Sequence, residues 1–141
     1  MDDDYLLIGT APAVSDYLRL RQESGLTPRS ADQGRLALAG TWAACHIRHQ
    51  PSDETVAMGR LIGDGGWYFH VVDMAVLPEH QRRGLGDAIL GALLVFIRHA
   101  APAGAWVTLL ADPPGRRLYE RHGFAETAPG SVGMAQILDS P

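Results

Sequence analysis

The sequence contains the stretch Val72-Asp73-Met74-Ala75-Val76-Leu77-Pro78-Glu79-His80-Gln81-Arg82-Arg83-Gly84-Leu85-Gly86, which joins an apolar run to a short polar turn with two glycines. From Leu85 to Ile97, apolar residues recur at the spacing i, i+3, i+4, i+7 of an amphipathic helix. Glycines let main-chain N–H groups converge on one point, and a helix amino terminus adds partial positive charge. The stretch therefore predicts a strand, a tight turn and a helix whose start can bind a pyrophosphate group.

Two arginines, Arg82 and Arg83, add full positive charge to this turn. A P-loop is excluded because it needs a lysine after its last glycine, and the chain contains no lysine. A dinucleotide-binding fingerprint is excluded because Ile89 stands where its third glycine is needed. The alternative interpretation is a glycine-rich helix start with two solvated arginines.

The segment Gln81–Gly86 resembles the Gln/Arg-x-x-Gly-x-Gly/Ala signature of the GNAT superfamily of N-acyltransferases, and Ala75–Pro78 resembles the fourth strand of that family. A second segment, from Asp112 through Tyr119 to Phe124, resembles the family's Asn-x-x-Ala-x-x-Leu/Phe-Tyr-x-x-x-Gly-Phe pattern. The resemblance covers nearly the whole chain. It implies acetyl-CoA as co-substrate and a primary or secondary amine as acceptor. We expect the acetyl group to be transferred directly, through a ternary complex.

The patterning along the rest of the chain predicts a single mixed-sheet domain of the α/β class, spanning residues 1–141. Turn residues between three β-rich segments predict an antiparallel meander. The resemblance implies that the fourth and fifth strands, which are parallel, splay apart, and that helices flank the sheet. The expected strands are Tyr5–Ile8, Thr41–His49, Thr55–Ile62, Trp67–Leu77 and Ala105–Ala111, with closing strands at Phe124–Thr127 and Met134–Leu138; the expected helices span 13–24, 30–38, 85–100 and 113–122.

The composition bounds the function classes. The chain has 141 residues, of which 46% are hydrophobic, and a formal net charge of −4, which excludes wholesale disorder and argues against a nucleic-acid surface. A single cysteine, Cys45, excludes an internal disulfide and fits a reducing compartment. The acidic start is unlike a targeting peptide, and the longest apolar run, Ala88–Ile97, is too short to span a bilayer. We therefore expect a cytoplasmic protein without a membrane partner.

The resemblance assigns acetyl-CoA binding to two parts of the chain. The main chains of two strand residues are expected to pair with the pantetheine arm and the thioester oxygen, and N–H groups of the glycine turn are expected to bind the pyrophosphate. Asp112 stands where the family has asparagine, so its side chain accepts hydrogen bonds but cannot donate as an amide does. The expected acetyl-CoA-binding residues are Met74, Val76, Gln81, Arg82, Arg83, Gly84, Leu85, Gly86, Asp87 and Asp112.

Three residues are candidates for acid–base catalysis. Tyr119 matches the tyrosine with which the family protonates the departing CoA thiolate, and a phenol with a pKa of about 10 is protonated at neutral pH. His70 lies six residues before Val76, where relatives carry a glutamate or histidine base, and shares strand parity with Met74 and Val76 unless a bulge intervenes. Asp73 is the rival: it could orient the amine, accept its proton through water, or form a structural ion pair. The alternatives are a core tyrosine and a partly exposed strand histidine.

The acceptor is expected to be a small-molecule or peptide amine, and a homodimer is left open. No metal is expected, because the histidines show no ligand spacing with carboxylates. Cys45 and His46 are adjacent on a strand, so they face opposite ways and cannot form a nucleophile–base pair. A non-catalytic acyl-CoA-binding or sensing module, and a nucleotide-binding protein of another fold, are the alternative functions. The expected acceptor-site residues are Tyr17, Trp42, Trp67, Tyr68, Phe69, Asp64 and Asp73.

Overall fold

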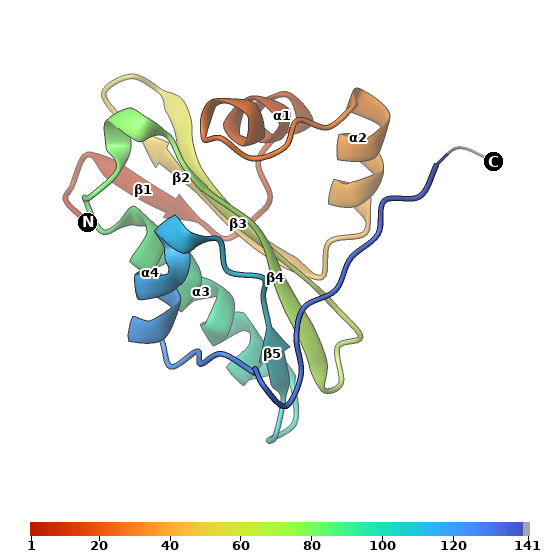
Figure 1. The fold of residues 1–141 in the computed structure, drawn as a ribbon. Coiled ribbons are helices and arrows are strands. Elements are labelled where there is room, and N and C mark those ends of the chain that lie inside the picture. Colours follow the sequence, from red (N-terminus) through yellow and green to blue (C-terminus); the bar gives the residue numbers. More distant parts are fainter. Residues whose placement is uncertain (140–141) are drawn as a thin grey trace. The chain divides into compact units, whose positions relative to one another are not determined.

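The computed structural model describes residues 1–139. A five-stranded sheet with the strand order β1-β2-β3-β4-β5 runs through the first part of the chain, residues 1–109 (Figure 1). The first four strands pair antiparallel and β5 pairs parallel to β4, which confirms the predicted fold class. The elements are β1 Tyr5–Ile8, α1 Val14–Glu23, α2 Ala31–Ala39, β2 Ala43–His49, β3 Glu54–Gly63, β4 Tyr68–Val76, η1 Pro78–His80, α3 Leu85–Ala100, β5 Trp106–Thr108, η2 Pro113–Gly115 and α4 Arg116–Arg121.

The chain forms two compact units. The first extends from Met1 to Leu109, and the second begins at Leu110 and contains η2 and α4. The expectation of one domain over residues 1–141 stays a prediction. Among the residues that the structure describes, no helix has the length and apolar character needed to cross a membrane.

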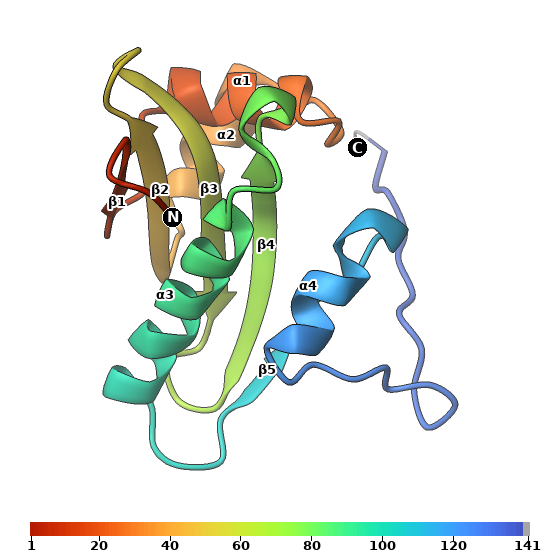
Figure 2. The same cartoon turned by 90° about the vertical axis from the view of Figure 1, so that its left-hand side faces the viewer.

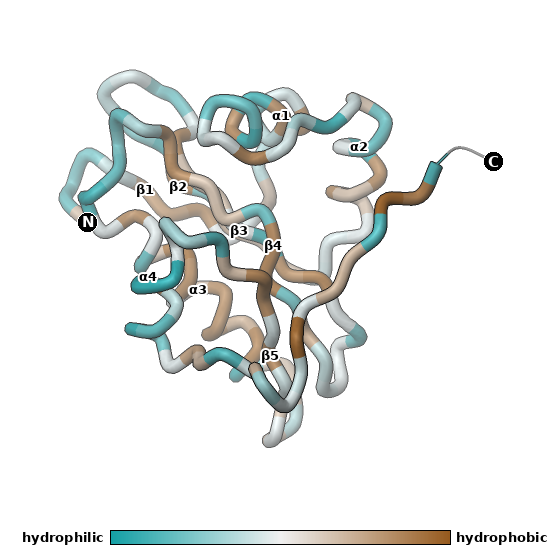
Figure 3. The backbone as a smooth tube through the Cα atoms, in the orientation of Figure 1, coloured by the Kyte–Doolittle hydropathy of each residue, from teal (hydrophilic) through white to brown (hydrophobic). Residues whose placement is uncertain are grey.

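Helices cover both faces of the sheet in the first unit. Figure 2 shows α3 lying across one face, whereas α1 and α2 lie against the other. The core lies between α3 and the strands, and apolar residues gather along both (Figure 3). Gly59 on β3 makes this packing close: a Cβ there would lie 2.5 Å from the Ile89 side chain and 2.7 Å from the Met74 sulfur. Only glycine therefore fits between β3 and α3 at this point.

Local sequence accounts for the start of α2 and for the buried face of α3. Ser30 caps α2, since its hydroxyl accepts a hydrogen bond from the Gln33 N–H while the Gln33 side chain accepts one from the Ser30 N–H. The apolar stripe of α3 is buried as its spacing predicts. Its buried residues are Leu85, Ile89, Leu90, Leu93 and Ile97.

A β-bulge interrupts β4 at Asp73. Met58 pairs with Ala75 and Arg60 pairs with Val72, so β4 carries one residue more than β3 between these pairs. Asp73 has a φ of 58°, a left-handed conformation that aspartate adopts more readily than most residues. The extra residue reverses the alternation of side chains along the strand beyond this point.

The bulge corrects the expected parity of His70. The Arg60 guanidinium donates to the Ala37 carbonyl of α2, so Arg60 faces the α1–α2 side of the sheet. Ile62 lies two residues further along β3 and shares that face, and His70 pairs with Ile62. His70 therefore faces the α1–α2 side as well. Met74 instead lies over Gly59 on the α3 side. His70 and the side chains of Met74 and Val76 are therefore on opposite faces of the sheet.

The second unit departs from the prediction in two ways. The segments Phe124–Thr127 and Met134–Leu138 form no strand, because no neighbouring strand pairs with them in the described part of the chain. Asp112 precedes η2 but its side chain makes no capping hydrogen bond, and the α-helix proper begins only at Arg116.

In the first unit, β5 ends at Thr108 rather than at Ala111.

Candidate functional site

The outer edge of β4 is unpaired beyond His70. Pairing with β5 ends at the pair His70 and Thr108, and no strand among the described residues pairs with the rest of β4 on that side. The Leu77 N–H donates to the Val56 carbonyl of β3, so Ala75 and Leu77 direct their main-chain groups toward β3. Met74 and Val76 therefore direct theirs toward the unpaired edge. This is the arrangement that a ligand needs to pair with β4 as an extra strand.

The turn after β4 supports this edge and exposes main-chain donors. The Gln81 amide Nε2 lies 3.1 Å from the Val76 carbonyl oxygen and donates a hydrogen bond to it. Arg82 and Gly84 have positive φ angles of 61° and 79°, which fold the turn tightly over the start of α3. Gln81 therefore braces the strand end in addition to any contact it makes with a ligand.

The N–H groups of this turn are available for an anion. Among residues 1–139, the main-chain N–H groups of Arg82, Arg83, Gly84 and Leu85 donate no hydrogen bond to the protein. All four residues except Leu85 are exposed. The α3 amino terminus contributes its partial positive charge at the same place, and Gly86 and Asp87 form its first turn. The loop predicted to hold pyrophosphate thus has the donors that this role requires.

His70 lies at the point where β4 and β5 separate. Its ring Nδ1 is 2.7 Å from the Thr108 hydroxyl oxygen, and the half-buried position lowers the pKa of His70 below its usual value. A lowered pKa keeps the imidazole uncharged at neutral pH and able to accept a proton. The hydrogen bond to Thr108 fixes the ring orientation and leaves Nε2 for a substrate. Sequence reasoning missed Thr108, because nothing local shows that β5 brings it to His70.

Asp73 lies at the centre of a buried ion-pair cluster. Its carboxylate accepts a hydrogen bond from the Tyr17 hydroxyl at 2.9 Å, another from Arg60 Nε at 2.7 Å, and a third from Arg21 Nη1. The Asp73 side chain is only 6% exposed. Burial, followed by the Asp73 charge, raises the pKa of Tyr17, so Tyr17 stays protonated and donates. All three donors occupy the carboxylate, so Asp73 has the structural ion-pair role that was one of those expected of it, and its catalytic role stays a prediction.

The two arginines of this cluster extend it into α1 and α2. Arg21 donates two hydrogen bonds to the Thr27 carbonyl in the loop between these helices. Arg60 donates to the Ala37 carbonyl near the end of α2. The cluster therefore ties both helices to the bulge of β4. Its members come from three separate elements, α1, β3 and β4, so spacing in the sequence did not reveal Arg21 or Arg60.

We expect Asp73→Asn to lower the free energy of unfolding by about 3 kcal/mol, because it leaves two buried guanidinium groups without their counter-charge. Urea unfolding of both proteins measures the difference. Asp32→Asn is the matched control, since the Asp32 and Arg35 side chains form an exposed pair whose loss costs about 1 kcal/mol or less. Equal stability of the Asp73 and Asp32 variants would show that the cluster does not hold the fold.

In the second unit, Tyr119 lies on α4. Its ring packs edge-on against Phe124 with 6.1 Å between centroids, and a Cβ at Gly115 would lie 3.0 Å from it. Burial, followed by the negative charge of Asp112, raises the pKa of Tyr119. The phenol is therefore protonated at neutral pH, as a proton donor must be. Gly123, with a φ of 87°, ends the helix as predicted.

The expected acceptor-site residues differ in their exposure to solvent. Tyr17 and Phe69 are buried, at 3% and 0% exposure, so they belong to the core, which corrects their expected role. Trp67 and Tyr68 are exposed. Trp42 is half-buried and packs edge-on against a core ring, whereas Asp64 accepts hydrogen bonds from three N–H groups of its own turn, which lower its pKa.

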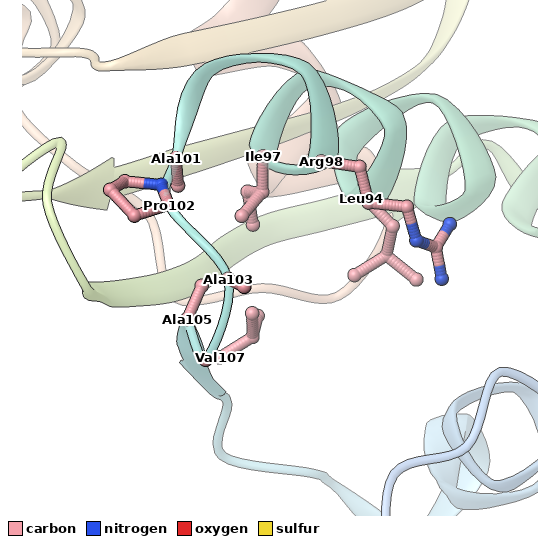
Figure 4. Close-up of a pocket in the computed structure, with 9 residues that line it drawn as sticks. Leu94, Ile97, Arg98, Ala101, Pro102, Ala103, Ala105 and Val107 are labelled. Atoms are coloured by element: carbon pink, nitrogen blue, oxygen red, sulfur yellow. The ribbon is translucent and has the colours of Figure 1, made fainter.

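Two other features lie apart from these residues. Cys45 is fully buried, and burial raises the pKa of its thiol to about 12. A cavity of about 440 Å³ lies between the end of α3, the following loop and β5, where Leu94, Ile97 and Val107 line it (Figure 4). It contains none of the predicted site residues. No cluster of three metal-ligating side chains occurs among residues 1–139.

Comparisons with known proteins identify relatives of this chain. The model of the acetyltransferase (GNAT) domain family matches residues 39–126. The mycothiol acetyltransferase of Rhodococcus erythropolis is 33% identical over 64% of this chain and 30% of its own length. The chloroplastic GCN5-related N-acetyltransferase 1 of Arabidopsis thaliana is 26% identical over 80% of this chain and 56% of its own length. The chain thus spans about half, or less, of the length of such relatives.

A solved structure resembles the chain over almost its full length. It is that of SA2161 from meticillin-resistant Staphylococcus aureus, described as a protein of unknown function and "Probable Acetyltransferase". The two chains are 30% identical, superpose with a TM-score of 0.89, and are covered to 95% and 99% respectively. With the family model spanning β2 to α4, and with an unpaired strand edge followed by a donor-rich turn, this chain belongs to the GNAT family of acetyltransferases.

Proposed function

We propose that this protein transfers the acetyl group of acetyl-CoA directly to an amine within a ternary complex. The proposal rests on two features that β4 brings together. The main-chain groups of Met74 and Val76 form an unpaired polar edge, and His70, earlier in the same strand, has a lowered pKa and is uncharged at neutral pH. The family uses acetyl-CoA as co-substrate. Its use by this chain, the direct transfer and the amine acceptor are the proposal.

Two parts of the first unit would hold acetyl-CoA. The N–H groups of Arg82, Arg83 and Gly84, together with the first turn of α3, would bind the pyrophosphate. The main chains of Met74 and Val76 would pair with the pantetheine arm, and such a pairing holds the thioester in a fixed orientation.

His70 and Tyr119 would supply the proton transfers. His70 Nε2 would accept a proton from the ammonium group of the acceptor, and the amine nitrogen would then attack the thioester carbonyl carbon. As the new C–N bond forms and the C–S bond breaks, the Tyr119 hydroxyl would donate its proton to the departing thiolate. As the amide forms, the nitrogen releases a second proton to solvent, His70 releases the proton it accepted, and Tyr119 regains one from solvent. The ammonium form of the amine and acetyl-CoA therefore give the amide, the CoA thiol and one proton.

The environment of Cys45 supports direct transfer over an acyl-enzyme. Its Sγ lies 3.6 Å from the Ile89 carbonyl oxygen inside the core, and a thiol with a pKa of about 12 forms almost no thiolate at neutral pH. An unpaired buried cysteine also supports a reducing compartment, and we propose the cytoplasm.

A non-catalytic acyl-CoA sensor is the second candidate function. It would keep the donor-rich turn but have no need of a tyrosine at the position of the family's proton donor, so the presence of Tyr119 there favours the enzyme. The two functions differ in a single assay: release of CoA thiol from acetyl-CoA, followed with a panel of primary amines. A sensor would bind acetyl-CoA and release no thiol above the rate without amine.

Gly84→Asp is expected to weaken acetyl-CoA binding by about 10–100-fold, because a negative charge would face the pyrophosphate. A Cβ at Gly84 would meet only the Met1 nitrogen at 3.6 Å, so the substitution introduces charge and backbone strain without a clash. Calorimetric titration with acetyl-CoA measures the affinity.

Gly104→Asp is the matched control for this variant. Gly104 has a φ of 91° and open space around it, so aspartate there causes the same kind of strain outside the turn. Equal affinity of the two variants for acetyl-CoA would show that residues 82–86 do not bind the pyrophosphate.

A further inference from the structure

One face of the sheet carries exposed apolar side chains around His70. Tyr68 pairs with Trp106 across β4 and β5, and His70 pairs with Thr108 on one side and Ile62 on the other. Paired residues point to the same face, and residues two apart in a strand do so as well. Ile62, Tyr68 and Trp106 therefore share the face of His70. They are 38%, 42% and 49% exposed, so α1 and α2 leave this end of the face uncovered.

The other end of the same face is closed and charged. There the side chains of Arg60 and Asp73 are 11% and 6% exposed and form an ion pair with each other. A ligand that reaches His70 from solvent on this face therefore meets apolar side chains rather than charged ones. The cavity beside α3 is on the opposite face, because Val107 alternates with Trp106 and Thr108.

The border of the apolar end carries a carboxylate. Asp64, in the turn before β4, accepts hydrogen bonds from the N–H groups of Gly66, Trp67 and Tyr68 at 2.8, 2.9 and 3.1 Å. The exposed side chains of Trp67 and Tyr68, two of the residues whose N–H groups bind this carboxylate, have ring centroids 5.3 Å apart. A carboxylate and aromatic faces both attract cations. This border therefore favours an amine that arrives protonated.

We propose that Ile62, Tyr68 and Trp106 form the acceptor-binding surface, and that the acceptor is an amine carried on an aromatic or branched aliphatic body. The inference rests on the proposed function, since it places the reacting nitrogen at His70. Residues two apart in a strand are about 7 Å apart. An apolar group linked to the nitrogen by two or three atoms therefore reaches Tyr68 and Trp106, as in a phenylethylamine or the amino terminus of a peptide with an apolar first residue.

The test compares two primary amines that differ in the apolar body, 2-phenylethylamine and ethanolamine, in the thiol-release assay. The unmodified protein is expected to show the higher kcat/KM with 2-phenylethylamine. Trp106→Ala should lower that value by about tenfold, the usual cost of removing a central aromatic contact, and leave ethanolamine turnover and the KM for acetyl-CoA unchanged. Val95→Ala, at an exposed apolar site on α3, is the matched control and should change neither amine.

Three results would overturn the inference. The first is an equal loss for both amines, and the second is no loss for either. The third is unchanged amine selectivity in Trp106→Ala together with a lower melting temperature or a changed sedimentation coefficient. That result would mean that another part of this chain, or a second copy of it, covers the surface. If Trp106→Ala does not fold, Trp106→Leu removes the ring and keeps an apolar side chain, with the same expected selectivity loss.

Failure of the proposed function looks different from failure of this inference. If the unmodified protein releases no thiol with either amine, the acetyltransferase proposal fails and the inference fails with it. If it acetylates ethanolamine as efficiently as 2-phenylethylamine, the acetyltransferase proposal stands and only the acceptor surface is wrong.

Discussion

Amine acetylation by the His70→Gln protein is expected to be about 10²–10⁴-fold slower than by the unmodified protein, which is the usual effect of losing a positioned base. Glutamine can still hydrogen-bond to Thr108, so packing at the fork between β4 and β5 changes little. Because burial lowers the pKa of His70, the logarithm of the unmodified rate should rise with pH through a limb below the usual histidine range. The variant should lack this limb.

Two controls separate this effect from others. His99→Gln changes an exposed histidine near the end of α3 and should leave the rate unchanged. Ionisation of the amine itself also produces a rise with pH, so two amines of different pKa are needed. A limb that moves with the amine, or that persists in His70→Gln, would exclude His70 as the base.

Tyr119→Phe is expected to lower turnover by about 10²–10⁴-fold while acetyl-CoA affinity stays nearly intact. The change removes one hydroxyl and keeps the ring that packs against Phe124. Loss of a group that acts only as the thiolate leaves should reduce kcat and kcat/KM together. Steady-state kinetics and calorimetry on the same preparation measure both quantities.

A loss of less than tenfold would identify Tyr119 as a packing residue. A melting temperature lowered without a change in kcat would have the same meaning. A raised pKa alone does not separate these outcomes, since burial, its main cause, acts on core tyrosines and on proton donors alike.

The sequence predicted those parts of the fold that depend on neighbouring residues. The stripe from Leu85 to Ile97 specifies the start and the buried face of α3, and α2 begins at Ala31, within the range 30–38 expected from the sequence. These signals lie within one helix, so no knowledge of the rest of the chain is needed. The donor-rich turn could be predicted for the same reason, from its glycines and their place before a helix.

Features that depend on distant residues could not be predicted in this way. Asp73 meets Arg21 across 52 positions and Arg60 across 13, and no period in the sequence links them. The bulge depends on which β3 residues pair with β4, which the β4 sequence does not contain. The two closing strands had suitable residues but no partner strand, and a β-rich segment without a partner does not form a strand.

The extra residue at Asp73 shifts the two-residue alternation of β4 by one position. Before Asp73, the even-numbered residues of β4 point their side chains toward α1 and α2 and their main-chain groups toward β3. After Asp73, the even-numbered residues point their side chains toward α3 and their main-chain groups toward the unpaired edge. One strand thereby presents a histidine on one face and a polar backbone edge a few residues later. Deleting that residue would leave the composition almost unchanged, yet it would exchange inside and outside along the remainder of the strand.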